Sequence, residues 1–390
     1  MKKVFFFLVV MAMAASCSRS SINERELFAN ADTITVDLDN PIKLELNRII
    51  DSVSFVRLET NKNCMVGKID EILFMDSTMI VVDQRTSRAA FVFDYDGQYI
   101  SKLSNLGNGP KEYLDITYVF KMSDSVVAIQ DRIKKKVFCF NRNGEFLYDF
   151  RASYVGGDME YIDENTYVHD VRGVGHIEGY NEGDYAYVTS DKGYHMIYGI
   201  GRNTYSKKMN YTQGKHLYRY NDTIYGVPNF EKVVYQLGPN CASAKYVLDI
   251  VSADVMDFDY KTSEDVIKLE QQYPFFKGEF IELDNYSFFR IRNKRGWYHV
   301  FYDHNSGVAY TAGYSYNHPF VLFFNKPYLT DSGNCLVTGE TVPALLRYKE
   351  QFYDGASVEI RKDLDALYND MKVDDNPVLF FYHLKDKIVE

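Results

Sequence analysis

From residue 77 onward, the chain alternates short apolar segments with turns rich in Asp, Asn and Gly. This alternation predicts β-strands joined by hairpins rather than amphipathic helices. The segments 80–82 and 127–129 are apolar at every position. Continuous apolar strands are expected where both faces of a sheet are covered. The pattern therefore predicts an antiparallel all-β protein whose middle strands lie between packed sheets.

The strand pattern is repeated along the chain. Residues 76–100 have a close copy in residues 124–147, offset by 47 to 48 residues. A repeat of this length is typical of a four-stranded β-propeller blade. In each copy an Asp-Gly or Asn-Gly pair, ending at Gly97 and at Gly144, predicts a type I′ hairpin turn.

Fainter copies continue toward the C-terminus and bring the count to six units. The early strand at 53–59 has no hairpin partner nearby. Pairing this strand with the C-terminal unit would close the ring and leave few free edges. We therefore expect a six-bladed β-propeller that forms a single domain over residues 33–390.

Two segments break the β pattern and predict helical insertions in the later blades. Ser263 is an N-cap residue followed by an acidic first turn. Further on, apolar residues recur at helical spacing at Ile360, Leu364, Leu367 and Met371. We expect both helices to pack over one face of the ring as lids or braces.

The N-terminus is predicted to be a targeting segment. Lys2 and Lys3 precede an apolar run over 4–15, and this order is typical of a secretory signal. The run is too short to cross a bilayer, which takes about 20 residues. The run ends in small residues directly before Cys17, which resembles the lipobox of bacterial lipoproteins. That resemblance implies a signal peptide over 1–16, cleavage before Cys17 and lipidation of its thiol and new amino group, followed by a tether over 17–32. The alternative is an ordinary secreted protein.

Composition and charge narrow the class of protein further. The 390 residues include 33 tyrosines and 27 phenylalanines but a single tryptophan. This excess of aromatic residues favours strands. The formal charge of −10 argues against a duplex nucleic-acid binder, which needs a basic face. We therefore expect no nucleic-acid partner.

Five segments together carry a resemblance to a known family: 56–60, 66–69, 91–97, 107–113 and 375–379. They are similar to the six-bladed β-propeller lipoproteins abundant in Bacteroidota, whose propellers are TolB-like or NHL-like. The most specific element is Gly-x-Gly-Pro-x-Glu-Tyr at 107–113. The resemblance implies a protein of the cell envelope and supplies no agreed chemistry. Ser18 follows the cysteine, where an Asp often retains lipoproteins in the inner membrane, so we expect an outer-membrane lipoprotein that faces either the periplasm or the cell surface.

Two loops are candidates for ligand binding. The first is a glycine-rich loop whose backbone could come close to an anion; it contains Gly107, Gly109, Lys111, Glu112 and Tyr113. The loop lacks the Walker pattern of phosphate-binding loops. The alternative is a structural turn between blades.

The second candidate contains His169 and His176, seven residues apart and near several carboxylates, which could bind a cation or could form an exposed polar loop. No metal signature and no nucleophile elbow occur in the chain, so we predict no metal, no cofactor and no catalytic residue. The remaining cysteines are Cys64, Cys139, Cys241 and Cys335. We expect them to be buried free thiols because they are far apart in the chain, and the alternative is disulfides, which persist in an oxidising envelope.

Two functions stay open at this point. The first is a non-catalytic binding or protein-interaction module, anchored to the membrane through Cys17, whose partner is a glycan, a peptide or another envelope protein. The alternative is an envelope hydrolase or lyase with a site at the mouth of the propeller channel. The residues that line this mouth would separate the two, because catalysis needs His, Arg and carboxylate groups that converge.

Overall fold

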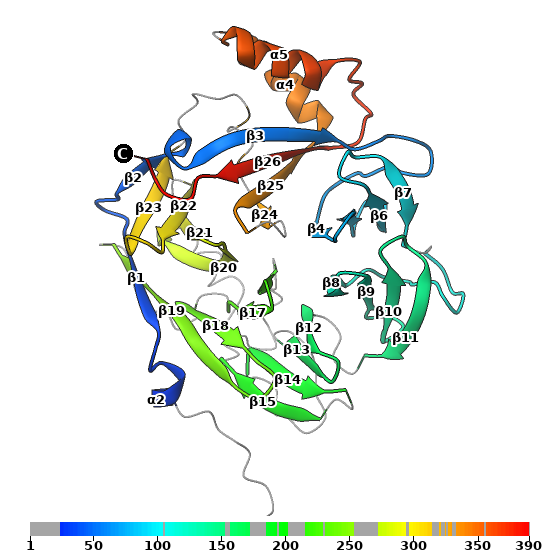
Figure 1. Ribbon diagram of the computed structural model, residues 1–390. Coiled ribbons are helices and arrows are strands. Elements are labelled where there is room, and N and C mark those ends of the chain that lie inside the picture. The colour runs from blue at the N-terminus through cyan, green and yellow to red at the C-terminus, as the bar shows by residue number, and fades with distance from the viewer. Residues whose placement is uncertain are drawn as a thin grey trace, which may run out of the picture.

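Six β-sheets surround a central axis in the computed structural model of the chain (Figure 1). The structure describes residues 24–103, 106–152, 157–171, 185–192, 195–201, 215–228, 231–252, 272–293, 296–313, 320, 324, 327–329, 333–354 and 356–389. The predicted six-bladed β-propeller is confirmed.

The first three blades each consist of four consecutive antiparallel strands. The first comprises β4 (Glu71–Phe74), β5 (Met79–Asp83), β6 (Ala89–Phe93) and β7 (Tyr99–Lys102). The second comprises β8 (Tyr118–Ser123), β9 (Val126–Asp131), β10 (Lys136–Asn141) and β11 (Phe146–Arg151). The third comprises β12 (Met159–Asp163), β13 (Thr166–Asp170), β14 (Tyr187–Asp191) and β15 (Met196–Ile200).

The fourth and fifth blades have the same four-strand plan. The fourth comprises β16 (Leu217–Tyr220), β17 (Thr223–Gly226), β18 (Val233–Leu237) and β19 (Ala242–Val251). The fifth comprises β20 (Phe275–Glu282), β21 (Tyr286–Asn293), β22 (Gly296–Asp303) and β23 (Val308–Gly313). In each of these five blades the first strand is innermost (Figure 1).

The sixth blade closes the ring by combining both ends of the propeller. Its inner strands are β24 (Tyr328–Leu329), β25 (Cys335–Glu340) and β26 (Val378–Leu384). Its outermost strand is the N-terminal β3 (Ile50–Arg57), which pairs antiparallel with β26 and places Phe55 opposite Phe380. The expectation that an early strand joins the C-terminal blade is confirmed.

Two further N-terminal strands form an outer layer that the sequence pattern did not reveal. β1 (Asp32–Asp37) adds in parallel to β19, and β2 (Lys43–Glu45) adds in parallel to β23. Ile34 and Val36 of β1 and Leu44 of β2 are buried. The short helix α2 (Glu24–Leu27) precedes β1 and lies against β19, and Leu27 is buried there. The N-terminal segment therefore covers the outer edges of the fourth and fifth blades before it enters the sixth.

The continuous apolar strands are explained by packing between blades. All five residues of β5 are buried. Ile80 and Val82 face Val127 and Ile129 of the second blade, whereas Met79 and Val81 pack with Val337 and Leu379 of the sixth blade. Each middle strand thus contributes alternate residues to two different interblade cores.

The hairpin turns differ from the predicted type I′. Gly97 has φ +85° and Gly144 has φ +88°, but neither Asp96 nor Asn143 has a positive φ, which a type I′ turn requires at both central residues. The amide of Gly97 donates to the Asp94 carbonyl, and the amide of Asp94 donates to the Gln98 carbonyl. These are four-residue turns that end in a glycine bulge.

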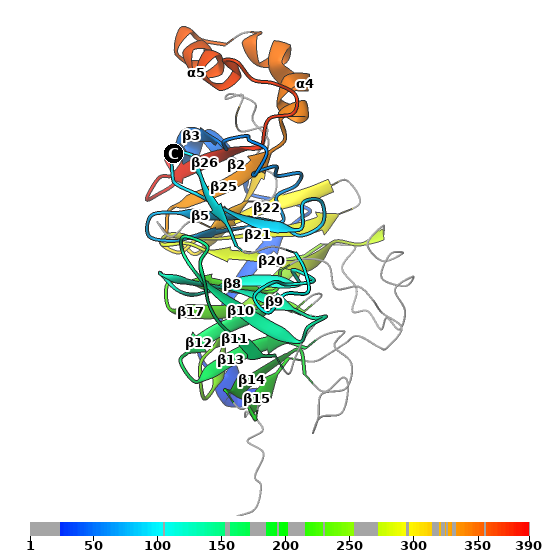
Figure 2. The same ribbon diagram turned by 90° about the vertical axis from the view of Figure 1, so that its right-hand side faces the viewer.

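The helices of the sixth blade project outward from the ring. α4 (Val342–Tyr353) and α5 (Val358–Tyr368) connect β25 to β26. Both views place them beyond the outermost strand β3, so the expectation that they cover one face of the ring is wrong (Figures 1 and 2). Their apolar faces join the core of the sixth blade through Leu345 and Leu364. The helix expected to begin at Ser263 lies outside the described residues.

The four cysteines of the propeller are free thiols. Cys64, Cys139 and Cys335 are buried as expected, but Cys241 is exposed because it lies in the turn between β18 and β19. Burial raises the pKa of Cys64 and of Cys139 to about 12, so both are protonated at neutral pH. Within the part of the chain that the structure describes, no helix has the length and apolar character needed to cross a membrane.

Candidate functional site

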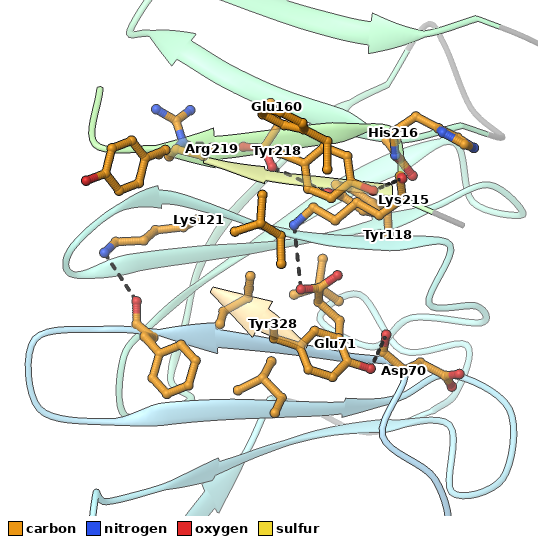
Figure 3. Close-up of a pocket in the computed structure, with 18 of the residues that line it drawn as sticks. Asp70, Glu71, Tyr118, Lys121, Glu160, Lys215, His216, Tyr218, Arg219 and Tyr328 are labelled. Carbon is orange, nitrogen blue, oxygen red and sulfur yellow. Dashed lines mark hydrogen bonds and ion pairs between the residues drawn. The ribbon is translucent and has the colours of Figure 1, made fainter. Parts of the chain in front are cut away.

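A cavity of about 1130 Å³ runs along the axis of the ring. Residues from all six innermost strands line it, and they come from both ends of those strands. Figure 3 shows how charged and tyrosine side chains from the first four blades point toward one another there. The repeated fold produces this convergence because each blade contributes its first strand to the same axis.

The central feature of the cavity is an ion pair that crosses it. The ammonium nitrogen of Lys215 lies 3.5 Å from Oε1 of Glu71 (Figure 3). Glu71 is the first residue of β4 in the first blade, and Lys215 lies two residues before β16 of the fourth blade. The blades follow chain order around the ring, so these two face each other across the axis (Figure 1).

Aromatic rings and further carboxylates surround the Lys215 ammonium group. It lies 5.8 Å from the ring centroid of Tyr118 and 6.0 Å from that of Tyr218, within the range of cation–π attraction. Burial alone would lower the pKa of Lys215, but Glu71, Glu160 and Asp158 outweigh it and raise the pKa. The lysine is therefore held as a cation.

A second ion pair joins the third and fourth blades beside this lysine. Oε2 of Glu160 lies 3.5 Å from Nε of Arg219, and Oε1 accepts a hydrogen bond of 3.4 Å from the hydroxyl of Tyr118. Glu160 is only 3% exposed, and this burial raises its pKa although Arg219 and Lys215 favour the carboxylate. Neither Glu160 Oε2 nor Arg219 Nε has a hydrogen-bond partner among the described residues.

Asp158 anchors the strand that carries these cations. Its Oδ2 accepts hydrogen bonds from the backbone amides of His216, at 2.5 Å, and Leu217, at 3.3 Å. Through these bonds the third blade positions the start of β16. The imidazole of His216 points away from Glu160 and Arg219 in the close-up (Figure 3). His216, Arg219 and Glu160 line one cavity, but their functional groups do not converge on one point.

The fifth blade contributes the only tryptophan of the chain. Arg290 forms an ion pair with Glu279, and its guanidinium carbon lies 4.4 Å from the ring centroid of Trp297. All three residues line the cavity. Trp297 therefore places a natural fluorescent probe at the site.

The far end of the innermost strands carries a third interblade contact. The ammonium group of Lys121 lies 2.8 Å from Asp124 and donates to the backbone carbonyl of Phe74 at 3.2 Å. Because Asp124 is exposed, this pair contributes little to stability.

The cavity is arranged for recognition by paired polar groups and rings. Burial raises the pKa of Tyr118 and of Tyr218 well above the ordinary value, so neither is a phenolate at neutral pH. No group of three or more metal-ligating side chains occurs among the described residues. Neutral phenols, paired charges and aromatic faces can hold a polar ligand without a reactive group.

The predicted glycine loop lies outside this cavity, between the first and second blades. The carboxylate of Glu112 lies against the glycines, and the amide of Gly109 donates to Oε2 of Glu112 at 2.8 Å. A Cβ at Gly107 would lie 2.1 Å from the same oxygen. Tyr113 is buried, and the Lys111 ammonium lies 5.4 Å from the ring centroid of Phe146. The loop thus cradles an anion, namely the chain's own Glu112 side chain.

The predicted histidine pair is described only in part. His169 is buried in β13, where its Nε2 lies 3.0 Å from Oγ of Ser190. Burial lowers the pKa of His169 to about 3, so the ring is neutral at physiological pH. His176 and Cys17 lie outside the described residues. The ligand roles of both loops and the lipid attachment stay predictions.

The residues of the cavity were not identified from the sequence. One signal could have found the innermost strands, because they directly precede Asp76 and Asp124, which occupy the same position in the first two repeats. Extending this 48-residue offset backward aligns Glu71 with Val119, the residue after Tyr118. Such alignment locates the strands that line the axis, but it does not show which side chains meet across it.

Comparisons with known proteins agree with this architecture. A crystal structure of a Bacteroides fragilis protein described as exported has a TM-score of 0.74 at 17% identity and covers 90% of this chain and 99% of that chain. A DUF4221 family member from Bacteroides vulgatus has a TM-score of 0.51 at 10% identity, with coverages of 86% and 97%. At these identities both show the fold alone. Among curated proteins nothing matches the chain. The model of a family described as a domain of unknown function, DUF4934, matches residues 31–383, and the chain therefore belongs to the DUF4934 family.

Proposed function

We propose that this protein is a lipid-anchored β-propeller of the cell envelope that acts as a non-catalytic binding or protein-interaction module. The observation that carries the proposal is the central cavity, with its interblade ion pairs and aromatic rings. Ligand sites are typically concave and combine apolar walls with a few fixed polar groups. The ligand classes that suit such a site are a glycan, a peptide or part of another envelope protein, and we propose no nucleic-acid partner.

The arrangement of charges favours binding over catalysis. Lys215 and Arg219 are each directed to a carboxylate, and the tyrosines beside them are neutral phenols. A general base or nucleophile needs a group that is free to accept or donate a proton at the reacting atom. In this cavity the ammonium and guanidinium groups are instead paired with carboxylates.

Fluorescence of Trp297 tests the proposal directly. Because this is the only tryptophan, any change in its emission reports on the cavity. Glycans, peptides and extracts of envelope proteins would be titrated separately into the purified mature protein. A saturable change that is lost in Arg219→Ala supports a binding module. If no titrant changes the emission or the thermal denaturation midpoint, the proposal fails.

The envelope location is proposed from the lipobox-like residues before Cys17 and from the exported B. fragilis protein of the same fold. Lipidation at Cys17 would anchor the protein stably, because two or three acyl chains supply far more than the marginal binding of one. Metabolic labelling with a fatty-acid precursor, followed by membrane fractionation, is expected to label the wild type in the outer membrane and not Cys17→Ala. An unlabelled wild type would instead indicate an ordinary secreted protein.

One observation favours the alternative of an envelope hydrolase or lyase. Burial raises the pKa of Glu160, and a buried carboxyl group with a raised pKa is typical of a general acid. Glu160→Gln separates the two functions. An enzyme would lose turnover while it retains binding, whereas a binding module has no turnover to lose and changes only in affinity.

A further inference from the structure

The charge balance of the central cavity is negative. Among the described residues that line it, ten carry carboxylates and six carry basic side chains. Five of the basic side chains already lie within ion-pair distance of a carboxylate: Lys68, Lys121, Lys215, Arg219 and Arg290. A concave site with an excess of one charge concentrates ligands of the opposite charge. An incoming cation is therefore favoured over an anion.

Lys215 shows what kind of cation the cavity accepts. Its ammonium group lies at Glu71, with the rings of Tyr118 and Tyr218 on its sides and the charges of Glu160 and Asp158 nearby. Carboxylates combined with aromatic faces are the usual elements of an ammonium-binding site. Here they surround a side chain that belongs to the protein itself.

The site also retains binding capacity that Lys215 does not use. Oε2 of Glu160 is buried in the cavity wall and faces Nε of Arg219 at 3.5 Å, an ion pair without the geometry of a hydrogen bond. The oxygen therefore still has room to accept a hydrogen bond. A ligand with several N–H donors could satisfy this oxygen.

We propose that the ligand of the cavity is a small aliphatic ammonium compound, which displaces the ammonium group of Lys215 from Glu71 and donates to Glu160. Lys215 is then an internal occupant of the site that competes with the ligand. This inference rests on the proposed binding function, and it adds the chemical class of the ligand.

The test uses spermidine, a flexible trication, with Trp297 emission as the readout in the full mature protein. The wild type is expected to bind spermidine saturably, and the affinity should fall as salt is added. Glu71→Gln should weaken binding about tenfold, as expected when one close charge partner is lost. Glu359→Gln removes an exposed carboxylate on α5, far from the cavity, and should leave the affinity unchanged.

The decisive variant is Lys215→Met, which keeps the length of the side chain and removes its charge. Spermidine should bind this variant at least about fivefold more tightly than the wild type, because the internal competitor is gone. Lys121→Met is the matched control, since it removes another cavity lysine that is paired at the exposed end. A purely structural role of Lys215 predicts weaker or unchanged binding in Lys215→Met.

Maltotriose and citrate distinguish failure of this inference from failure of the proposed function. If maltotriose or citrate changes Trp297 emission while spermidine does not, the cavity binds a ligand but not a cation, and this inference is wrong. Equal tightening in Lys215→Met and Lys121→Met would also overturn it, because it would reflect net charge alone. If Lys215→Met does not fold, the wild type and Glu71→Gln still decide. Should none of the three compounds, nor any glycan or peptide, change the emission, both proposals fail.

Discussion

The ammonium group of Lys215 and the carboxylate of Glu71 lie 3.5 Å apart across the axis of the propeller, although they belong to opposite blades. The same ammonium group also lies 5.8 Å from the ring centroid of Tyr118 in the second blade. Lys215 therefore connects the fourth blade with two blades that are not its neighbours in the ring.

The first prediction concerns this pair. Glu71→Gln and Lys215→Met should each lower the free energy of unfolding by about 1–3 kcal/mol, because each leaves a partly buried charge without its partner. This loss lies between those expected for a surface ion pair and for a fully buried one. The double variant should lose less than the sum of the two. Urea denaturation of the four proteins gives the coupling energy directly. Strict additivity would show that the two groups do not interact.

The second prediction is a pH dependence that arises at the end of β25. Burial raises the pKa of Glu340 to about 7, whereas a glutamate in the unfolded chain titrates near 4.5. Between these values the folded protein binds the extra proton, so stability falls as the pH rises from about 5 to about 7 and the loss is complete above that range. Because Glu340 is only partly buried, we expect a loss of about 1–3 kcal/mol.

Glu340→Gln removes this titration because the amide is neutral at every pH. The variant should be more stable than the wild type at about pH 8 and similar to it at about pH 5. Denaturant titrations at the two pH values measure the difference, with the exposed Glu359→Gln as the control. An identical pH profile for Glu340→Gln and the wild type would contradict the assignment.

The third prediction concerns the glycine that docks the first blade on the sixth. A Cβ at Gly97, where φ is +85°, would lie 2.3 Å from the carbonyl oxygen of Arg57 in β3. Gly97→Ala should therefore cost about 2–4 kcal/mol through backbone strain and displacement of β3.

Gly307 provides a matched control for this effect. It also has a positive φ, of +68°, but the nearest atom to its Cβ position is 4.0 Å away. Gly307→Ala should cost only about 1–2 kcal/mol, the cost of the left-handed conformation alone. Thermal denaturation of the two variants compares the steric and conformational contributions. Equal losses would mean that β3 moves aside at no cost.

The fourth prediction tests the glycine loop at 107–113. Glu112→Ala removes the carboxylate that fills the cradle and should destabilise the loop by about 1–2 kcal/mol. The amide of Gly109 and the ammonium group of Lys134, which donates to the Gly109 carbonyl at 2.9 Å, stay in place. Inorganic phosphate should then raise the denaturation midpoint of the variant more than sodium chloride at equal ionic strength does. If phosphate has no specific effect, the anion-binding prediction for this loop is wrong.

Much of the fold could be predicted from the sequence because it depends on local patterns. The apolar runs at 80–82 and 127–129 follow from blade packing, in which each face of a middle strand is covered by a different neighbour. The 47-to-48-residue repeat determined the blade architecture, and the unpaired early strand indicated how the ring closes. The turn type at Gly97 was not predictable, since an Asp-Gly pair suits more than one hairpin and the docking of β3 selects among them.

The outer strands β1 and β2 and the position of α4 and α5 depended on longer-range packing. A three-residue strand such as β2 has no periodicity to detect, and it forms only because β23 offers an open edge. An amphipathic helix shows that one face is covered but not which surface covers it, so the helices were expected over a face of the ring and lie beyond its rim.

The sequence by itself determined the repeat, the strand order and the residues with apolar side chains, because these follow from the covalent order and the two-residue period of a strand. Only the tertiary structure decided which charged residues meet. Glu71 and Lys215 are 144 residues apart in the chain, and no local pattern links them. They become neighbours because six repeats close into a ring of fixed diameter, which brings the first strands of opposite blades within reach of two long side chains.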